Sequence, residues 1–177
     1  TLHEEGITPE AIDKAALDFG MPMGPVELAD TVGIDICYLV AKNLAESFGS
    51  KVPEILNRYI SDNYLGKKTG RGFYRYKKGK PIKNRDADLG DQKIIQNRLL
   101  FRLLNGAAAC IDEKIVANEN LLDAGVIFGA GFAPFRGGPL NYSRQTSVDD
   151  ITQTMTQYSE LYGERFKPVK GWKLIKD

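Results

Sequence analysis

The sequence has few residues of the kinds that carry catalysis, metal binding or membrane insertion. Its 177 residues include one histidine, His3, and two cysteines, Cys37 and Cys110, without metal-ligand spacing. The net charge of +1 gives no general attraction to nucleic acids or anionic membranes. No apolar run approaches the roughly 20 residues that span a bilayer. We therefore predict buried, reduced thiols, as is usual in a reducing compartment, and no transmembrane segment.

The usual catalytic patterns are also missing. The glycine turn Gly129-Ala130-Gly131 follows a predicted helix rather than a strand, so a dinucleotide-binding turn is excluded there. His3 has no nearby partner pattern, and the serines lack the strand-turn-helix context of a nucleophile elbow. The residues alone predict a module that shapes a site or binds a partner domain, not a self-sufficient catalyst.

Helical patterns cover most of the chain. Capping residues and apolar spacing predict helices at 9–19, 25–32, 35–48 and 91–114, and helices that begin near 53, 118 and 147. Only Phe73 to Tyr76 reads as a short extended piece, and no alternating stretch is long enough to build a sheet. The predicted fold class is all-α.

The N-terminal segment recurs later in the chain. At an ungapped offset of 109, identical residues include Phe19 and Phe128, Gly20 and Gly129, and Pro25 and Pro134. Such an offset predicts a duplicated structural unit. The partner of Asn97 would precede Thr1, and the chain lacks an initiator Met, so we expect a piece of a longer protein. The predicted division is a truncated first repeat at 1–78, a linker at 79–90 and a second repeat at 91–177.

A basic segment lies between the predicted repeats. It contains Lys67, Lys68, Arg71, Arg75, Lys77, Lys78, Lys80, Lys83 and Arg85, with Phe73, Tyr74 and Tyr76 among them. Charge and aromatic rings together could hold single-stranded nucleic acid or a phosphate-rich ligand. A solvated surface loop explains the composition equally well, and the near-neutral chain favours no nucleic-acid partner.

The turn at Met21 to Pro25 is the first candidate site. Its small residues and the following helix N-terminus would let a ligand or another helix approach the backbone closely. On residue types alone, a packed helix-to-helix turn is the favoured interpretation.

Long motifs in both halves resemble one enzyme family. DFGMPMGPVELADTVGID at 18–35 and GKKTGRGFYRY at 66–76 resemble the C-terminal domain of 3-hydroxyacyl-CoA dehydrogenases. FGAGFAPFRGGPLNY at 128–142 and LYGERFKP at 161–168 resemble the end of multifunctional fatty-acid oxidation α-subunits. The resemblance implies two tandem, similar helical bundles (6-phosphogluconate dehydrogenase C-terminal-like) joined by the basic linker.

The resemblance also implies a function. The intact parent would be an NAD-dependent (3S)-3-hydroxyacyl-CoA dehydrogenase of fatty-acid β-oxidation, with an enoyl-CoA hydratase region. Hydride would pass from C3 to NAD⁺ while a histidine, oriented by a glutamate, removes the hydroxyl proton. NAD and both catalytic residues belong to a preceding domain, so this chain is expected to hold no catalytic, cofactor or metal residue and to be inactive alone. The helical unit would close one wall of the cleft.

Substrate contacts and partners follow from the same resemblance. The substrate-binding residues would be Met23, Gly24, Pro25, Leu28 and Phe128, while Asn97 is a pseudo-equivalent of a substrate-contacting asparagine. The implied partners are acyl-CoA, the chain's own nucleotide-binding domain and a thiolase β-subunit. The implied compartment is the bacterial cytoplasm, or the mitochondrial matrix or peroxisome in a eukaryote. A purely structural module for inter-domain or thiolase docking is the alternative.

Overall fold

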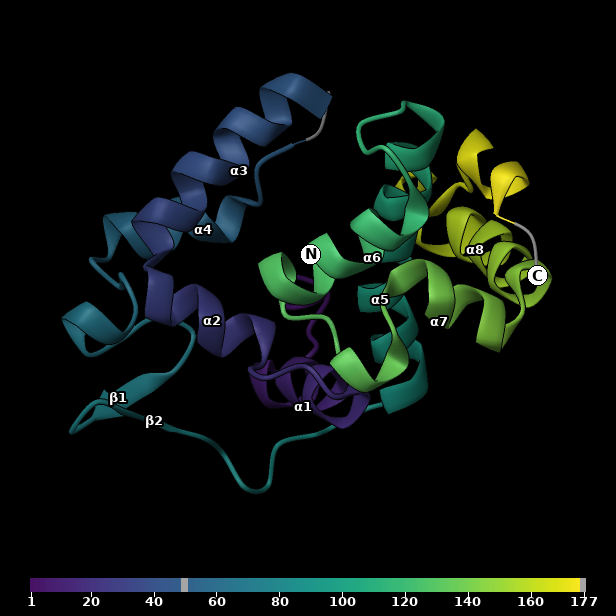
Figure 1. Ribbon diagram of the computed structural model, residues 1–177. Coiled ribbons are helices and arrows are strands. Elements are labelled where there is room, and N and C mark those ends of the chain that lie inside the picture. Colours follow the sequence, from purple (N-terminus) through teal and green to yellow (C-terminus); the bar gives the residue numbers. More distant parts are fainter. Residues whose placement is uncertain (49–50, 176–177) are drawn as a thin grey trace. The chain divides into compact units, whose positions relative to one another are not determined.

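The computed structural model describes residues 1–48 and 51–175 (Figure 1). Its residues form two compact units. Unit 1 contains Thr1–Asp18 and Met23–Ile95, and unit 2 contains Phe19–Pro22 and Gln96–Asp177. Helices dominate both units, which confirms the predicted mostly helical fold. No described helix is both long and apolar enough to cross a membrane.

Unit 1 is built from four α-helices and a small hairpin. Its elements are α1 (Pro9–Phe19, whose last residue falls in unit 2), α2 (Pro25–Val32), α3 (Ile34–Phe48), α4 (Glu54–Ser61), the 3-10 turn η1 (Lys67–Thr69), β1 (Arg75–Lys77) and β2 (Lys80–Ile82). The Thr8 hydroxyl accepts a hydrogen bond from Ala11 N–H at 3.2 Å and so caps α1 as predicted. Pro25 starts α2, and Gly33, at φ 110°, ends it by donating to the Ala29 carbonyl. Local sequence therefore sets the ends of these helices.

The hairpin was not predicted. β1 and β2 pair antiparallel with Arg75 opposite Ile82, so the expectation that no sheet forms is wrong at this place. The strands are only three residues long, which is too short for an alternating pattern to stand out. Their connection is Lys78-Gly79, both at positive φ, as a tight two-residue hairpin turn requires. That dipeptide was the available signal.

The segment at 79–90, predicted as a linker between two repeats, is part of unit 1 in the structure. Its first part is β2, and the chain then runs along α1 inside unit 1. Asn84 N–H donates to the Glu10 carboxylate at 2.7 Å, and the Thr8 hydroxyl donates to the Asp88 carbonyl at 2.7 Å. The basic segment is therefore folded against unit 1, which continues to Ile95.

Unit 2, as far as the structure describes it, is built from four α-helices and three 3-10 turns. They are α5 (Gln92–Asp112, which begins in unit 1), α6 (Glu119–Ala130), η2 (Pro134–Arg136), α7 (Pro139–Thr146), α8 (Val148–Tyr162), η3 (Glu164–Phe166) and η4 (Lys170–Leu174). Asp91, Asn118 and Ser147 cap α5, α6 and α8 through their side chains, as predicted. Helix α7 was missed, although Gly138-Pro139 begins it in the same way as Gly24-Pro25 begins α2.

The unit 2 core is mostly apolar, and Asn105 forms a polar clamp within it. Leu104, Phe132, Leu140 and Met155 are fully buried. Asn105 lies on the buried face of α5, where its side-chain oxygen accepts from Trp172 Nε1–H at 2.9 Å and from Val169 N–H at 3.1 Å. Its amide nitrogen donates to the Lys167 carbonyl at 2.9 Å. One side chain thus fixes the C-terminal segment on α5.

Replacing Asn105 by alanine should destabilise unit 2 by about 3 kcal/mol, because buried groups on the 167–172 segment lose their partners. Urea unfolding followed by Trp172 fluorescence measures this loss. Gln157→Ala on the exposed face of α8 is the control and should change the unfolding free energy by less than about 0.5 kcal/mol. Equal midpoints for the two variants would contradict the clamp.

Candidate functional site

A buried carboxylate fixes the start of α2, the predicted substrate segment. Asp13 on α1 is 1% exposed. Its two oxygens accept hydrogen bonds from Val26 N–H at 2.7 Å and Glu27 N–H at 3.1 Å. These N–H groups belong to the first turn of α2 and have no partner within the helix. A negative charge there also interacts favourably with the helix dipole.

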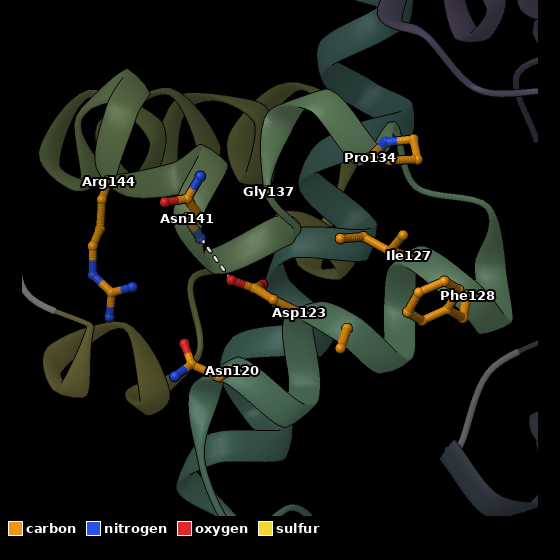
Figure 2. Close-up of a pocket in the computed structure, with 9 residues that line it drawn as sticks. Asn120, Asp123, Ile127, Phe128, Pro134, Gly137, Asn141 and Arg144 are labelled. Carbon is orange, nitrogen blue, oxygen red and sulfur yellow. Dashed lines mark hydrogen bonds between the residues drawn. The ribbon is translucent and has the colours of Figure 1, made fainter.

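Unit 2 contains the same arrangement (Figure 2). Asp123 on α6 accepts from Leu140 N–H at 2.8 Å and Asn141 N–H at 3.1 Å, in the first turn of α7. Both capped helices begin with a glycine followed by proline, Gly24-Pro25 and Gly138-Pro139. The two units therefore share one local device.

This device corrects the sequence correspondence between the halves. The helix caps Thr8 and Asn118, and the carboxylates Asp13 and Asp123, are 110 residues apart, not 109. At the following turn the offset between the halves is larger. Gly24 matches Gly138, because each precedes the proline that begins a helix whose first N–H groups bind the aspartate. The ungapped offset paired Gly24-Pro25 with Ala133-Pro134, which is wrong. The turn after α6 is longer and contains η2, and an ungapped comparison cannot register that difference.

Close packing explains why both positions are glycine. A Cβ at Gly24 would lie 2.2 Å from Asp13 Cγ, and a Cβ at Gly138 would lie 2.3 Å from Asp123 Cβ. No side chain fits at those distances. The predicted role of Gly24 at the substrate site stays a prediction, and its missing side chain also makes room for Asp13.

A second buried carboxylate organises the motif at 66–76. Asp30, at the buried face of α2, is 0% exposed and accepts from the N–H groups of Phe73 and Tyr74, each at 2.9 Å. It also accepts from the Tyr76 hydroxyl at 3.2 Å. The Tyr74 hydroxyl donates to Asp13 at 2.9 Å and joins the two carboxylates into one network.

Burial decides the protonation behaviour of this network. Desolvation raises the pKa of Asp13 and of Asp30, while their hydrogen bonds oppose that rise. Desolvation likewise raises the pKa of Asp123 against the hydrogen bonds from Leu140 and Asn141. Burial first, and then the neighbouring aspartates, raise the pKa of Tyr74 and of Tyr76 above the usual value of 10. Both tyrosines remain hydrogen-bond donors at neutral pH.

The acids were not predicted as special, because they resemble surface acids on amphipathic helices. A signal existed for Asp13, which follows Ala11 and Ile12 and precedes Ala15 and Ala16, all of them buried. Helical spacing places such a residue on the core side, where an acid requires partners.

The predicted substrate residues of unit 1 lie at the start of α2 and differ in exposure. Met23 is 38% exposed, Leu28 is 49% exposed, and Pro25 is also exposed, whereas Gly24 is buried. Further exposed apolar side chains follow along α2 and α3: Val32, Ile36, Leu39, Val40 and Leu44. The α2 start therefore offers an apolar surface held in place from behind by Asp13.

Phe128 lies in unit 2, at a hollow of about 690 Å³ (Figure 2). The hollow has two kinds of wall. Figure 2 shows Asn120, Asn141 and Arg144 at one end, and Ile127 with the 88%-exposed Phe128 at the other. Its remaining lining residues are Asp123, Ala124, Pro134 and Gly137. Such a hollow suits a ligand with both an apolar and a polar part.

The chain's histidine has a structural role, and no metal cluster is evident. His3 Nδ1 lies 3.0 Å from the Ile7 carbonyl oxygen, and the ring packs edge-on against Phe73. Among residues 1–48 and 51–175, no group of three or more His, Cys, Asp or Glu side chains is placed to hold a metal ion.

Comparison with known proteins agrees with the fold and the motifs. Residues 1–76 match the family model "3-hydroxyacyl-CoA dehydrogenase, C-terminal domain". The matched segment contains the Asp13 and Asp30 network and the exposed start of α2.

Relatives extend the similarity to nearly the whole chain. The fatty acid oxidation complex subunit alpha of Vibrio cholerae is 37% identical over 92% of this chain, and that of Shewanella sp. MR-4 is 36% identical over 93%. The chain spans about a quarter of the length of these relatives, 25% and 26% respectively.

Two crystal structures share the fold across both units. The 3-hydroxybutyryl-CoA dehydrogenase of Escherichia coli K12 has a TM-score of 0.76 at 18% identity, with 98% of this chain and 55% of that chain covered. The dehydrogenase part of multifunctional enzyme 1 from C. elegans has a TM-score of 0.69 at 22% identity, with coverages of 97% and 43%.

Alanine at Gly24 or Gly138 should destabilise the chain by at least about 2 kcal/mol, because the new Cβ overlaps a buried aspartate. Gly138→Ala should cost more than Gly24→Ala, since Gly138 also has a φ of 98°. Chemical unfolding followed by far-UV circular dichroism provides the measurement.

The matched control is Gly125→Ala in the middle of α6, where a Cβ meets nothing within 4 Å. It should stabilise the chain by about 0.5–1 kcal/mol. Wild-type stability in both Gly24→Ala and Gly138→Ala would show that the two aspartates do not require a bare backbone beside them.

The pH dependence of stability should report the buried charge of Asp13. Its folded pKa lies above the ordinary value of 3.8, so folding favours the protonated form. The contribution of Asp13 is therefore complete below pH 3.8 and is lost as the pH rises through the folded pKa. Asp13→Asn cannot titrate at this position. The free energy of unfolding of the wild type minus that of the variant, the stability gap, should therefore increase as the pH falls from 7 to 4. Urea unfolding across this range measures the gap, and a gap that narrows would mean that the hydrogen bonds outweigh burial.

Proposed function

We propose that this chain forms the substrate side of an NAD-dependent (3S)-3-hydroxyacyl-CoA dehydrogenase of fatty-acid β-oxidation. The parent would be a multifunctional enoyl-CoA hydratase and dehydrogenase, as the similarity to fatty acid oxidation α-subunits suggests. The observation that carries the proposal is the rigidly capped, exposed apolar start of α2 within a 3-hydroxyacyl-CoA dehydrogenase C-terminal domain.

The described residues contain no dinucleotide-binding unit of the kind that holds NAD. The glycine turn at Gly131 follows helix α6, and the described strands form only the hairpin β1–β2, so no strand-glycine-helix unit is available for the pyrophosphate. We therefore assign NAD and the catalytic histidine and glutamate to a preceding domain. This chain alone should be inactive.

The chain's own contribution is a shaped wall. Met23, Pro25 and Leu28 present apolar surface to an acyl chain, and such a wall excludes water from the reacting centre. Gly24 contributes indirectly, because its missing side chain lets Asp13 hold the α2 backbone in one position. Precise placement matters because small shifts of a substrate-contacting wall cost much of the rate.

Phe128 would add a second acyl-CoA contact from unit 2. Its exposed ring stands at a hollow that also contains the side-chain amides of Asn120 and Asn141. The pantetheine arm of CoA has amide groups and short apolar segments, which suits this pair of walls. Asn97 remains a candidate contact on α5, where its side chain is half-buried.

The second candidate function is a docking module for other domains or for a thiolase β-subunit. Exposed apolar side chains on α3 favour this docking function, because helical spacing places them on adjoining faces of the helix. They are Ile36, Leu39, Val40 and Leu44. The proposed compartment in either case is the bacterial cytoplasm, in keeping with the bacterial relatives.

Leu28→Asp should separate these functions in a full-length dehydrogenase that contains this chain. If Leu28 lines the acyl site, the charge should raise KM for a 3-hydroxyacyl-CoA about tenfold or more, since a buried unpaired charge costs over 1.4 kcal/mol. NADH affinity and the melting temperature should stay near wild type, because the Leu28 side chain is half exposed. Steady-state kinetics, NADH titration and thermal melting give the three readouts.

Leu161→Asp is the control, because Leu161 is 71% exposed on α8 and lies outside the proposed site. It should leave KM unchanged. An unchanged KM in Leu28→Asp, together with loss of thiolase co-purification, would contradict the substrate role and support docking.

A further inference from the structure

A separate hollow of unit 1 gathers three arginines around a small space. It has a volume of about 490 Å³ and lies beside α4 and the segment that leads into β1. Arg58, Arg71 and Arg75 line it, and Asp62 is the acid among its lining residues. No ion pair of the described residues engages any of these three guanidinium groups.

Aromatic rings form the rest of the wall. Tyr59 packs against both Tyr64 and Phe73, with ring centroids 6.0 Å and 5.0 Å away. The Arg71 guanidinium carbon lies 3.9 Å from the centroid of the Tyr64 ring. Stacking on an aromatic face orients a guanidinium and leaves its N–H edge free for an oxyanion.

The backbone around the hollow is held rigidly from inside. Phe73 and Tyr74 N–H groups are bound by the buried Asp30, and the Tyr74 hydroxyl is bound by Asp13. Gly72 touches Asp30 so closely that a Cβ there would lie 2.0 Å from the carboxylate oxygen. Arg71 and Arg75 thus flank a fixed segment, so their positions are set before any ligand arrives.

The charges of the residues that line the hollow are unequal, with three arginines and one acid, Asp62. Arg58 also lines a neighbouring hollow that contains Glu4 and Glu54, which offset its charge in part. Arg71 and Arg75 do not line this neighbouring hollow with its two glutamates. The acid that lines their own hollow, Asp62, is exposed. Like charges held in one space repel each other, and an anion between them removes that repulsion.

We propose that this hollow binds a phosphate-bearing aromatic ligand of the nucleotide class, with phosphate on Arg71 and Arg75 and the base against the tyrosine rings. Arginine suits phosphate because its planar fork donates two parallel hydrogen bonds. Aromatic side chains stack on any base. The volume lies within the range of small-molecule sites. Neither the α2 surface nor Phe128 lines the hollow, so this inference does not rest on the proposed dehydrogenase function.

Isothermal titration of the 177-residue chain with ADP tests the proposal. We expect saturable binding with a Kd below about 1 mM and at least about tenfold weaker binding of adenosine and of inorganic phosphate. Absence of saturable ADP binding overturns the site. Equal binding of inorganic phosphate overturns the nucleotide assignment, and equal binding of adenosine overturns the phosphate role.

Arginine variants locate the binding. Arg75→Gln and Arg71→Gln should each weaken ADP binding about tenfold or more, because each removes a charge-assisted contact. Arg71→Lys keeps the charge but loses the fork and should recover only part of the affinity.

Arg85→Gln removes an exposed positive charge outside the hollow and should change the Kd less than twofold. Far-UV circular dichroism confirms that each variant is folded. ADP binding that is unaffected by Arg75→Gln and Arg71→Gln, or equally weakened by Arg85→Gln, overturns the proposal.

Discussion

A buried carboxylate placed against the bare start of a helix is the interaction on which both units depend. The first N–H groups of α2 and α7 cannot be satisfied within their own helices. Asp13 and Asp123 reach them from α1 and α6, and each carboxylate fits only because the residue before the helix-starting proline is glycine. Hydrogen bonds and the helix dipole offset only part of the desolvation of each carboxylate.

Unit 1 extends this interaction into a network that positions two different surfaces. Tyr74 links Asp13 to the segment bound by Asp30, so the start of α2 and the approach to β1 share one buried polar centre. The apolar surface with Met23 and Leu28 lies at the start of α2, which Asp13 holds. The arginines of the proposed nucleotide hollow flank the segment that Asp30 holds. A fully satisfied buried network of this kind fixes one arrangement of the backbone.

Unit 2 uses the same cap with a different turn and a different second anchor. The turn between α6 and α7 contains η2, whereas α1 and α2 are joined without a 3-10 turn. Asn105 organises the C-terminal segment, since its amide both donates and accepts. The two units thus share one helix-capping arrangement but differ in the turn that leads to it.

The sequence by itself determined the helical class, most helix ends and the family resemblance of residues 1–76. These features are local: Thr8, Asn118 and Ser147 are capping residues, and prolines and glycines mark starts and stops wherever they fold. Only the tertiary structure decided the correspondence of the halves, the hairpin and the roles of Asp13, Asp30 and Asp123. Those roles depend on partners 13 to 61 positions away in the chain, such as Val26 and Tyr74 for Asp13. A carboxylate on a helix has the same sequence appearance whether it faces water or another helix, and only folding chooses between them.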